Sequence, residues 1–108
     1  MTLYEVFKRD NILVEFLYNH KGKENIVAKK EIAKHLEERG YKTKVSTINM
    51  KIRKLIFERK IPLCSINSKG YYWANTKQEI LDTIADLEGR IDEMKNRIEL
   101  LNSFVLFY

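Results

Sequence analysis

The feature that most constrains this chain is an apolar repeat in its last third. From Ile80 to Tyr108, apolar residues recur at alternating steps of four and three. A stripe this narrow, sustained over about four heptads, is typical of a helix that pairs with another helix. We therefore predict a dimerising coiled-coil helix in this region. Its contact residues are Ile80, Ile84, Leu87, Ile91, Met94, Ile98, Leu101 and Val105.

The charges that flank this repeat leave its pairing partner open. Ile and Val at the first heptad position, with mostly Leu and Met at the fourth, favour two parallel strands. In that register Arg90 meets Lys95 of a second copy, and in an antiparallel pair it faces Arg97 of that copy. Because both arrangements bring like charges together, a partner helix with acidic flanks is an alternative to the homodimer. Folding back onto the rest of the chain is a third possibility.

The start of this helix is marked by Thr76, which is followed three residues later by Glu79. This is the capping-box pattern, in which each side chain bonds the backbone N–H of the other residue. We therefore divide the chain into a domain over residues 1–76 and a coiled-coil helix over residues 77–108. Apolar residues outside the repeat need cover from a bundle, from the domain or from a partner protein. They are Phe104, Leu106 and Phe107.

Three helices are predicted in the first 76 residues from apolar side chains at helical spacing. The first covers residues 4–20 and the second residues 29–39, after which Gly40 is typical of a helix C-terminus. The third begins at Thr43 or Ser46 as N-cap. The residues expected to face the core from the second and third helices are Ile32, Ala33, Leu36, Ile48, Ile52, Leu55 and Ile56.

A β-hairpin is predicted to follow the third helix. Pro62 ends the helical region, and two short β-prone runs over residues 63–66 and 71–74 flank the turn residues 67–70. Gly70 suits this turn because glycine adopts positive φ at low cost. Helices followed by a hairpin indicate the α+β class, with the order of a winged helix-turn-helix domain and a long C-terminal helix.

The aromatic run Tyr71-Tyr72-Trp73 allows two interpretations. Exposed aromatic rings can stack on the bases of single-stranded nucleic acid. In a strand, however, Tyr71 and Trp73 share one face and Tyr72 lies on the other, so at least one face should belong to the core. We favour the structural interpretation.

The net charge of +5 is unevenly distributed. Residues 21–60 contain 13 Lys and Arg against 5 Asp and Glu, whereas residues 77–101 contain 4 against 7. A basic cluster of this kind is expected of a protein that binds the phosphate backbone. A solvated Lys-rich surface is the alternative.

The third helix is the candidate for reading DNA. In a helix-turn-helix pair, residues near the N-terminus of the second helix reach base edges in the major groove. Asn can bond adenine, Thr and Met can contact a thymine methyl, and Lys neutralises phosphates. An ordinary polar helix face is the alternative. The predicted DNA-binding residues are Lys44, Ser46, Thr47, Asn49, Met50, Lys51 and Lys54, with Lys69 in the hairpin turn.

Four stretches carry a family resemblance: KKEIA with Leu36 in residues 29–36, STINMKIRKL in 46–55, IPL in 61–63 and KGYYWA in 69–74. Together they resemble the winged-helix domains of the biotin-repressor type, which recur in bacterial regulators and in small phage-encoded proteins. The resemblance covers roughly residues 10–75. It implies a third helix in the major groove and a wing that touches the backbone through Lys69. The turn before the third helix is longer than is usual in this family, and the family's ligase activity is not carried over.

Catalysis and cofactor binding are not expected. The chain has no nucleophile motif, P-loop, glycine fingerprint or paired-carboxylate arrangement. Cys64 has no partner at metal-ligand spacing, and His20 and His35 lie apart without acidic or Cys companions, so no metal site is predicted. The charged N-terminus and the lack of a long apolar run predict neither a signal peptide nor a membrane span. With a single unpaired cysteine, we expect a cytoplasmic protein.

These features together predict a dimeric protein that binds double-stranded DNA, a small transcriptional regulator of bacterial or phage type. The alternative is a protein-interaction module, such as a phage inhibitor or adaptor of host machinery. In that case the winged helix and the apolar C-terminus would dock a protein partner.

Overall fold

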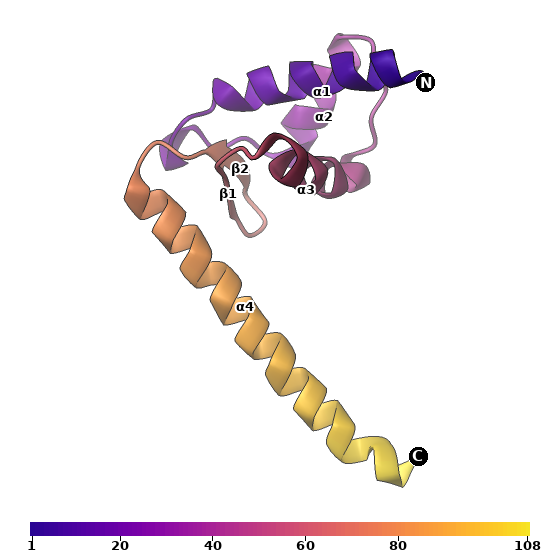
Figure 1. Cartoon of the computed structure of the whole chain (residues 1–108), viewed down its shortest axis with the longest axis vertical. Coiled ribbons are helices and arrows are strands. Elements are labelled where there is room, and N and C mark those ends of the chain that lie inside the picture. The colour runs from indigo at the N-terminus through magenta and orange to yellow at the C-terminus, as the bar shows by residue number, and fades with distance from the viewer.

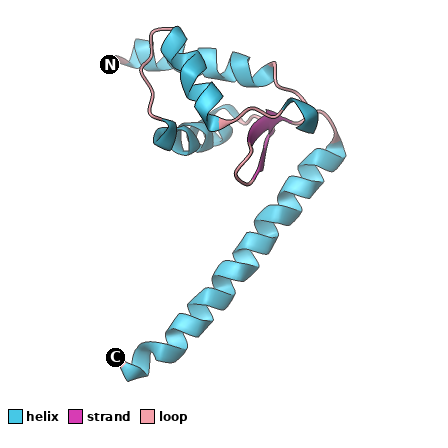
Figure 2. Cartoon of the chain, turned by 180° about the vertical axis from the view of Figure 1, so that it is seen from behind, coloured by secondary structure: helices cyan, strands magenta, loops and turns pink.

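The computed structural model describes residues 1–108, which form four α-helices and one β-hairpin. Three helices and the hairpin make up a body, from which the fourth helix extends (Figures 1 and 2). The predicted α+β class is confirmed. The elements are α1 (Leu3–Tyr18), α2 (Lys29–Glu38), α3 (Ile48–Arg59), β1 (Leu63–Ile66), β2 (Gly70–Trp73) and α4 (Lys77–Phe104). Three short 3₁₀ turns are η1 (Lys23–Asn25), η2 (Val45–Thr47) and η3 (Val105–Phe107).

One apolar core holds α1, α2 and α3 together. It contains nine buried residues, all but Ala33 at most 1% exposed. Full burial of a Leu or Ile side chain contributes about 1.5–3 kcal/mol, so this cluster dominates the stability of the body. The predicted stripes of the second and third helices lie in this core, except that Ile56 is half-buried at its edge. The core residues are Leu13, Leu17, Val27, Ile32, Ala33, Leu36, Ile48, Ile52 and Leu55.

Helix α2 ends where the sequence predicted, at a glycine cap. Gly40 has φ of +92°. Its N–H donates to the carbonyl of Glu37 at 3.0 Å, and the N–H of Tyr41 donates to the carbonyl of Leu36 at 2.9 Å. This is the Schellman pattern, which satisfies carbonyls that the last helical turn leaves free. The chain then reverses direction toward α3.

The start of α3 differs from the prediction. Neither Thr43 nor Ser46 caps it: the helix begins at Ile48, and Thr47 is its N-cap residue without a side-chain cap bond. The hydroxyl of Thr47 instead donates to the carbonyl of Lys44 at 2.7 Å and closes the 3₁₀ turn η2. Hydroxyl side chains often bond the local backbone in this way. Here the 3₁₀ turn leads directly into α3.

Strand β2 is paired on both of its edges. On one edge it pairs antiparallel with β1, from Leu63 opposite Trp73 to Ile66 opposite Gly70. On the other edge it pairs with the segment between α1 and α2. Val27 and Tyr71 exchange both backbone hydrogen bonds, at 2.8 and 2.9 Å. The sequence did not reveal this third partner because only isolated residues of the segment pair.

The two faces of β2 are covered by different parts of the chain. Tyr71 and Trp73 pack against the main core. Tyr72 faces the other way and is 3% exposed, close to Cys64 and to Thr83 of α4. Burial raises the pKa of Tyr72 to about 12, so its hydroxyl remains protonated. The structural interpretation of the aromatic run is confirmed for both faces.

Gly70 is required where β2 meets the segment before α2. Its φ is +133°, and a Cβ at this position would collide with the backbone carbonyl of Val27. The close approach is what allows Val27 to pair with Tyr71. Glycine is therefore demanded here both by backbone conformation and by space.

Helix α4 begins at the predicted capping box. The Thr76 hydroxyl accepts from the N–H of Glu79 at 3.2 Å, and the Glu79 carboxylate accepts from the N–H of Thr76 at 3.1 Å. The same carboxylate also accepts from the N–H of Asn75 and from the N–H of Lys23, both at 2.7 Å. Because Lys23 belongs to η1, Glu79 ties the start of α4 to the far side of the hairpin.

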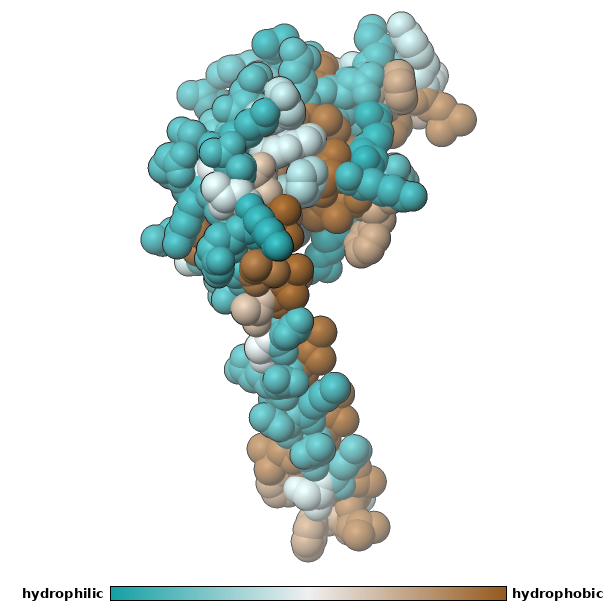
Figure 3. All heavy atoms as spheres, turned by 60° about the vertical axis from the view of Figure 1, so that its left-hand side comes forward, coloured by the Kyte–Doolittle hydropathy of each residue, from teal (hydrophilic) through white to brown (hydrophobic).

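Beyond its first turns α4 extends into solvent, and none of its residues is buried. Its 28 residues correspond to a length of about 42 Å. The predicted contact residues form an exposed stripe on one side of the helix, and apolar side chains gather at its C-terminal end (Figure 3). Val105 departs from the prediction, because the α-helix ends at Phe104 and Val105 lies in η3.

No helix in the structure combines the length and the apolar composition needed to cross a membrane.

Replacing Gly70 with Ala should destabilise the protein, whereas Gly89→Ala should stabilise it. At Gly70 the added Cβ meets backbone, and we expect a loss of more than about 1 kcal/mol in the free energy of unfolding. Gly89 lies inside α4 with open space around it. There alanine should add about 0.5–1 kcal/mol. Urea denaturation of both variants checks this, and equal stabilities would contradict it.

Replacing Glu79 with Gln should lower the midpoint of thermal unfolding at neutral pH. The backbone N–H groups of Asn75 and Lys23 lower the pKa of the Glu79 carboxyl below its ordinary 4.5. A lowered folded-state pKa gives stability that is complete above 4.5 and is lost as the pH falls through the lowered value. The variant should lack this acid-dependent component. Glu93→Gln, an exposed carboxylate on α4, is the control and should behave as the wild type.

Candidate nucleic-acid interface

The predicted DNA-binding residues lie on two neighbouring elements, the N-terminal half of α3 with its preceding turn and the loop of the hairpin. Figure 1 shows the hairpin beside α3, and a hydrogen bond from Tyr71 of β2 to Asn49 of α3 joins the two. The structure therefore places the hairpin next to the N-terminal half of α3. The individual side chains differ in how available they are.

The turn before α3 exposes some of these residues and occupies others. Lys44 and Ser46 are exposed. Thr47 is half-buried, its hydroxyl donating to Lys44 and accepting from the ammonium of Lys51 at 3.3 Å. A hydroxyl with both roles filled has little capacity left for a base. Within this turn Ser46 is thus better placed for an outside contact than Thr47.

Lys51 lies toward α1 rather than fully in solvent. Burial lowers the pKa of Lys51, and the positive charge of Arg9 lowers it further while Asp10 opposes the change. Asp10 is 7% exposed and is itself paired with Arg9 at 3.3 Å. The Lys51 ammonium therefore lies near the Arg9–Asp10 pair of α1, and it donates to the Thr47 hydroxyl.

Three predicted residues stand out into solvent. Met50 is 65% exposed. Lys54 is exposed and makes only a weak ion pair with Glu58 at 3.9 Å. Lys69 is exposed in the hairpin loop, where Ser68 takes φ of +64°. Exposed pairs of this kind contribute little to stability, so Lys54 remains free to meet a phosphate.

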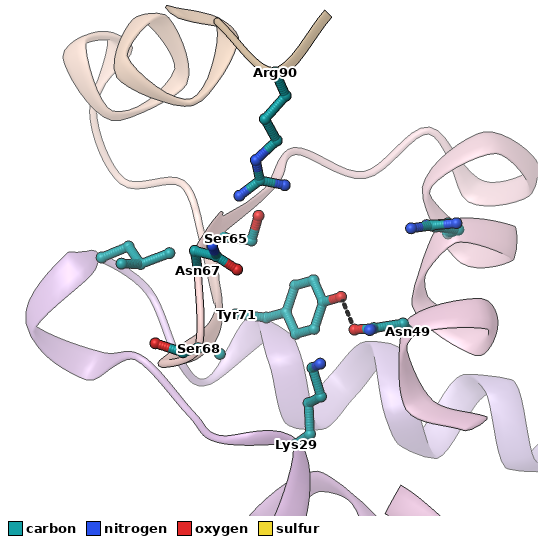
Figure 4. Close-up of a pocket in the computed structure, with 10 residues that line it drawn as sticks. Lys29, Asn49, Ser65, Asn67, Ser68, Tyr71 and Arg90 are labelled. Atoms are coloured by element: carbon teal, nitrogen blue, oxygen red, sulfur yellow. Dashed lines mark hydrogen bonds between the residues drawn. The ribbon is translucent and has the colours of Figure 1, made fainter. Parts of the chain in front are cut away.

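Asn49 is held by the strand beside it. The hydroxyl of Tyr71 donates to the Asn49 side-chain oxygen (Figure 4). Burial raises the pKa of Tyr71, opposed by the positive charges of Arg53 and Arg90, so the hydroxyl stays a donor. This hydrogen bond occupies the Asn49 side-chain oxygen and fixes the orientation of the half-buried side chain.

Asn49 and Tyr71 form part of a hollow of about 110 Å³ between α3, the hairpin and α4. Figure 4 shows Arg90 reaching down from α4 and Lys29 rising from the start of α2 toward Tyr71. The lining residues are Lys29, Asn49, Arg53, Ser65, Ile66, Asn67, Ser68, Gly70, Tyr71 and Arg90.

Sequence reasoning missed the cations of this hollow. Arg53 follows Asn49 by four residues and shares its helix face, a spacing that the sequence does display. Lys29 and Arg90 come from segments far away in the chain, and no sequence pattern links them to α3. Its side chains are mostly hydrogen-bond donors and cations, so the hollow suits a negatively charged ligand with acceptor oxygens. No group of three or more His, Cys, Asp or Glu side chains is arranged to hold a metal ion.

Comparisons of the chain with protein-family models, with curated proteins and with solved structures found no match.

Proposed function

We propose that this chain is a dimeric DNA-binding protein whose body is a winged helix-turn-helix domain. In this proposal α2 and α3 form the helix pair, α3 enters the major groove and the β1–β2 hairpin is the wing on the backbone. The order of three helices and a hairpin supports it, as does the pairing of β2 with the segment between α1 and α2. A small transcriptional regulator of bacterial or phage type fits these features.

One observation carries the proposal: the exposed side of α3 lies next to a hairpin loop that carries Lys69. A helix that reads base edges needs cations beside it to hold the phosphates on either side. Lys44 before α3, Lys54 on it and Lys69 beside it meet that need. The high content of Lys and Arg in residues 21–60, which include α2 and α3, also favours contact of this part of the chain with phosphates.

Replacing Lys54 and Lys69 together with Ala should weaken binding to all duplex sequences. Each lost phosphate contact should reduce the slope of log K against log salt by about 0.9. Asn49→Ala should instead relax preference at one base position. Fluorescence titration of labelled duplexes over a salt series measures both effects.

Lys8→Ala removes one positive charge from an exposed position on α1, outside the proposed interface, and should leave the salt slope unchanged. If the wild-type chain does not bind duplex DNA even at low salt, the proposed function is wrong. If the Lys8 variant and the double variant lost the same DNA affinity, binding would depend on the net charge of the protein and not on the proposed interface.

The dimer is proposed from the stripe on α4. Its residues from Ile80 to Leu101 are 39–61% exposed in the single chain, although they repeat at the spacing of a coiled-coil seam. An uncovered apolar stripe of this length is unfavourable in water, and a second copy of the same helix would bury it. A two-fold dimer would also place two α3 helices for a symmetric DNA site.

Replacing Ile91 with Asp should convert the dimer to a monomer without unfolding the body. Ile91 is half exposed in the single chain, so the charge disrupts only the seam. Asn96→Asp, an exposed change on the same helix away from the stripe, should leave the dimer intact. Sedimentation equilibrium of the two variants and the wild type measures this. A monomeric wild type would refute the homodimer.

A protein-interaction module is the second candidate, and the last residues favour it. Leu106 is 94% exposed, Phe107 is 80% exposed, and both lie in η3 beyond the α-helix. The seam of a two-helix dimer does not cover these side chains. A protein partner would provide cover for them, and a monomeric wild-type chain in the sedimentation experiment would favour this candidate.

A further inference from the structure

The hollow between α3, the hairpin and α4 gathers positive charge from three separate elements. Lys29 begins α2, Arg53 lies on α3 and Arg90 lies on α4, and all three line the same space. We propose that this hollow binds one phosphoryl group, supplied by the DNA backbone, and that Arg90 of α4 is a direct ligand. That the phosphoryl group belongs to DNA rests on the proposed function. That the ligand is a phosphoryl group is inferred from the residues that line the hollow.

The charges of the hollow are not balanced within the chain. No carboxylate lines it. None of the three cations takes part in an ion pair, since the two pairs in the structure are Arg9 with Asp10 and Lys54 with Glu58. Three cations without a carboxylate among the lining residues create a positive local potential, which favours an anion over a neutral or cationic ligand. A doubly or singly charged oxyanion is the occupant that suits this surplus.

The remaining lining residues are suited to an oxyanion. Ser65 and Ser68 bring hydroxyl donors, and Asn67 brings a side-chain amide. Arginine adds paired N–H donors that match two oxygens of a phosphate. Cations beside neutral hydrogen-bond donors are a lining that suits a phosphate.

The size of the hollow narrows the choice of ligand. Pockets for cofactors and drug-sized molecules enclose roughly 300–1,000 Å³. A hollow of about 110 Å³ is too small for a nucleoside but has room for a tetrahedral oxyanion. Arg53, Asn67 and Ser68 at its rim are exposed, so a phosphate that belongs to a longer backbone has access.

Arg90 links the hollow to the position of α4. The helix that carries the exposed stripe also supplies one wall of the hollow, and Glu79 fixes its start against η1 and the hairpin. A change in the direction of α4 would withdraw Arg90 from the other two cations. Occupation of the hollow and the position of α4 are therefore coupled.

The test replaces Arg90 with Gln in the full chain, with Arg97→Gln as the matched control. Both arginines occupy the same heptad position on α4, one heptad apart, but Arg97 does not line the hollow. We expect Arg90→Gln to weaken duplex binding about tenfold at low salt. It should also reduce the salt slope by about 0.9 for each hollow occupied. Arg97→Gln should change neither. Equal effects of the two substitutions would overturn DNA as the source.

A second measurement uses inorganic phosphate as the probe and does not depend on DNA binding. ¹H–¹⁵N spectra of the wild type are recorded with sodium phosphate and with sodium chloride at equal ionic strength. We expect phosphate-specific shifts at Ser65, Tyr71 and the Arg90 side chain, absent in Arg90→Gln and kept in Arg97→Gln.

The two measurements separate the proposals. If the wild type binds no DNA but shows these shifts, the proposed function fails and the hollow is a site for free phosphate. If DNA binds and Arg90→Gln matches Arg97→Gln in both measurements, the proposed function stands and the phosphoryl site is refuted. If the wild type shows no DNA binding and no phosphate shifts, both proposals are refuted.

Discussion

Strand β2 is the element on which the rest of the structure depends, because it has a neighbour on every side. Its edges pair with β1 and with Val27, and its faces pack on the main core and beneath the start of α4. Buried backbone groups must be paired, so a short strand with both edges satisfied is a stable centre for a small domain. The bare backbone of Gly70 makes this possible, since a side chain there would push Val27 away.

The same arrangement explains why the long helix is oriented and not simply tethered. Glu79 receives N–H groups from its own helix start and from Lys23, and Tyr72 packs between Cys64 and Thr83. These contacts direct α4 past the hairpin before it enters solvent. In this direction Arg90 comes within reach of the hollow at α3. The candidate site thus depends on contacts that lie far from it in the sequence.

Local patterns predicted the elements well where one physical cause dominates. The capping box at Thr76, the glycine after α2 and the core stripes of α2 and α3 all appear in the structure, because each reflects neighbouring residues on one element. The N-terminus of α3 was predicted wrongly because Thr47 bonds the local backbone and Thr43 bonds Tyr41. Several side chains compete for such turns, and only their packing selects among them.

The linear order of residues was sufficient to predict four helices, a hairpin and an apolar stripe on the last helix, since hydrophobic periodicity and capping are read along one segment. It could not establish which polar groups meet in space. Three contacts of this kind are decided by packing: Lys51 lies toward Arg9, and Tyr71 holds Asn49. The third is the hollow, which Lys29, Arg53 and Arg90 line together because α4 and the hairpin pack beside the helices. Contacts between distant segments depend on the combined packing of all elements, and no single stretch of sequence contains that information.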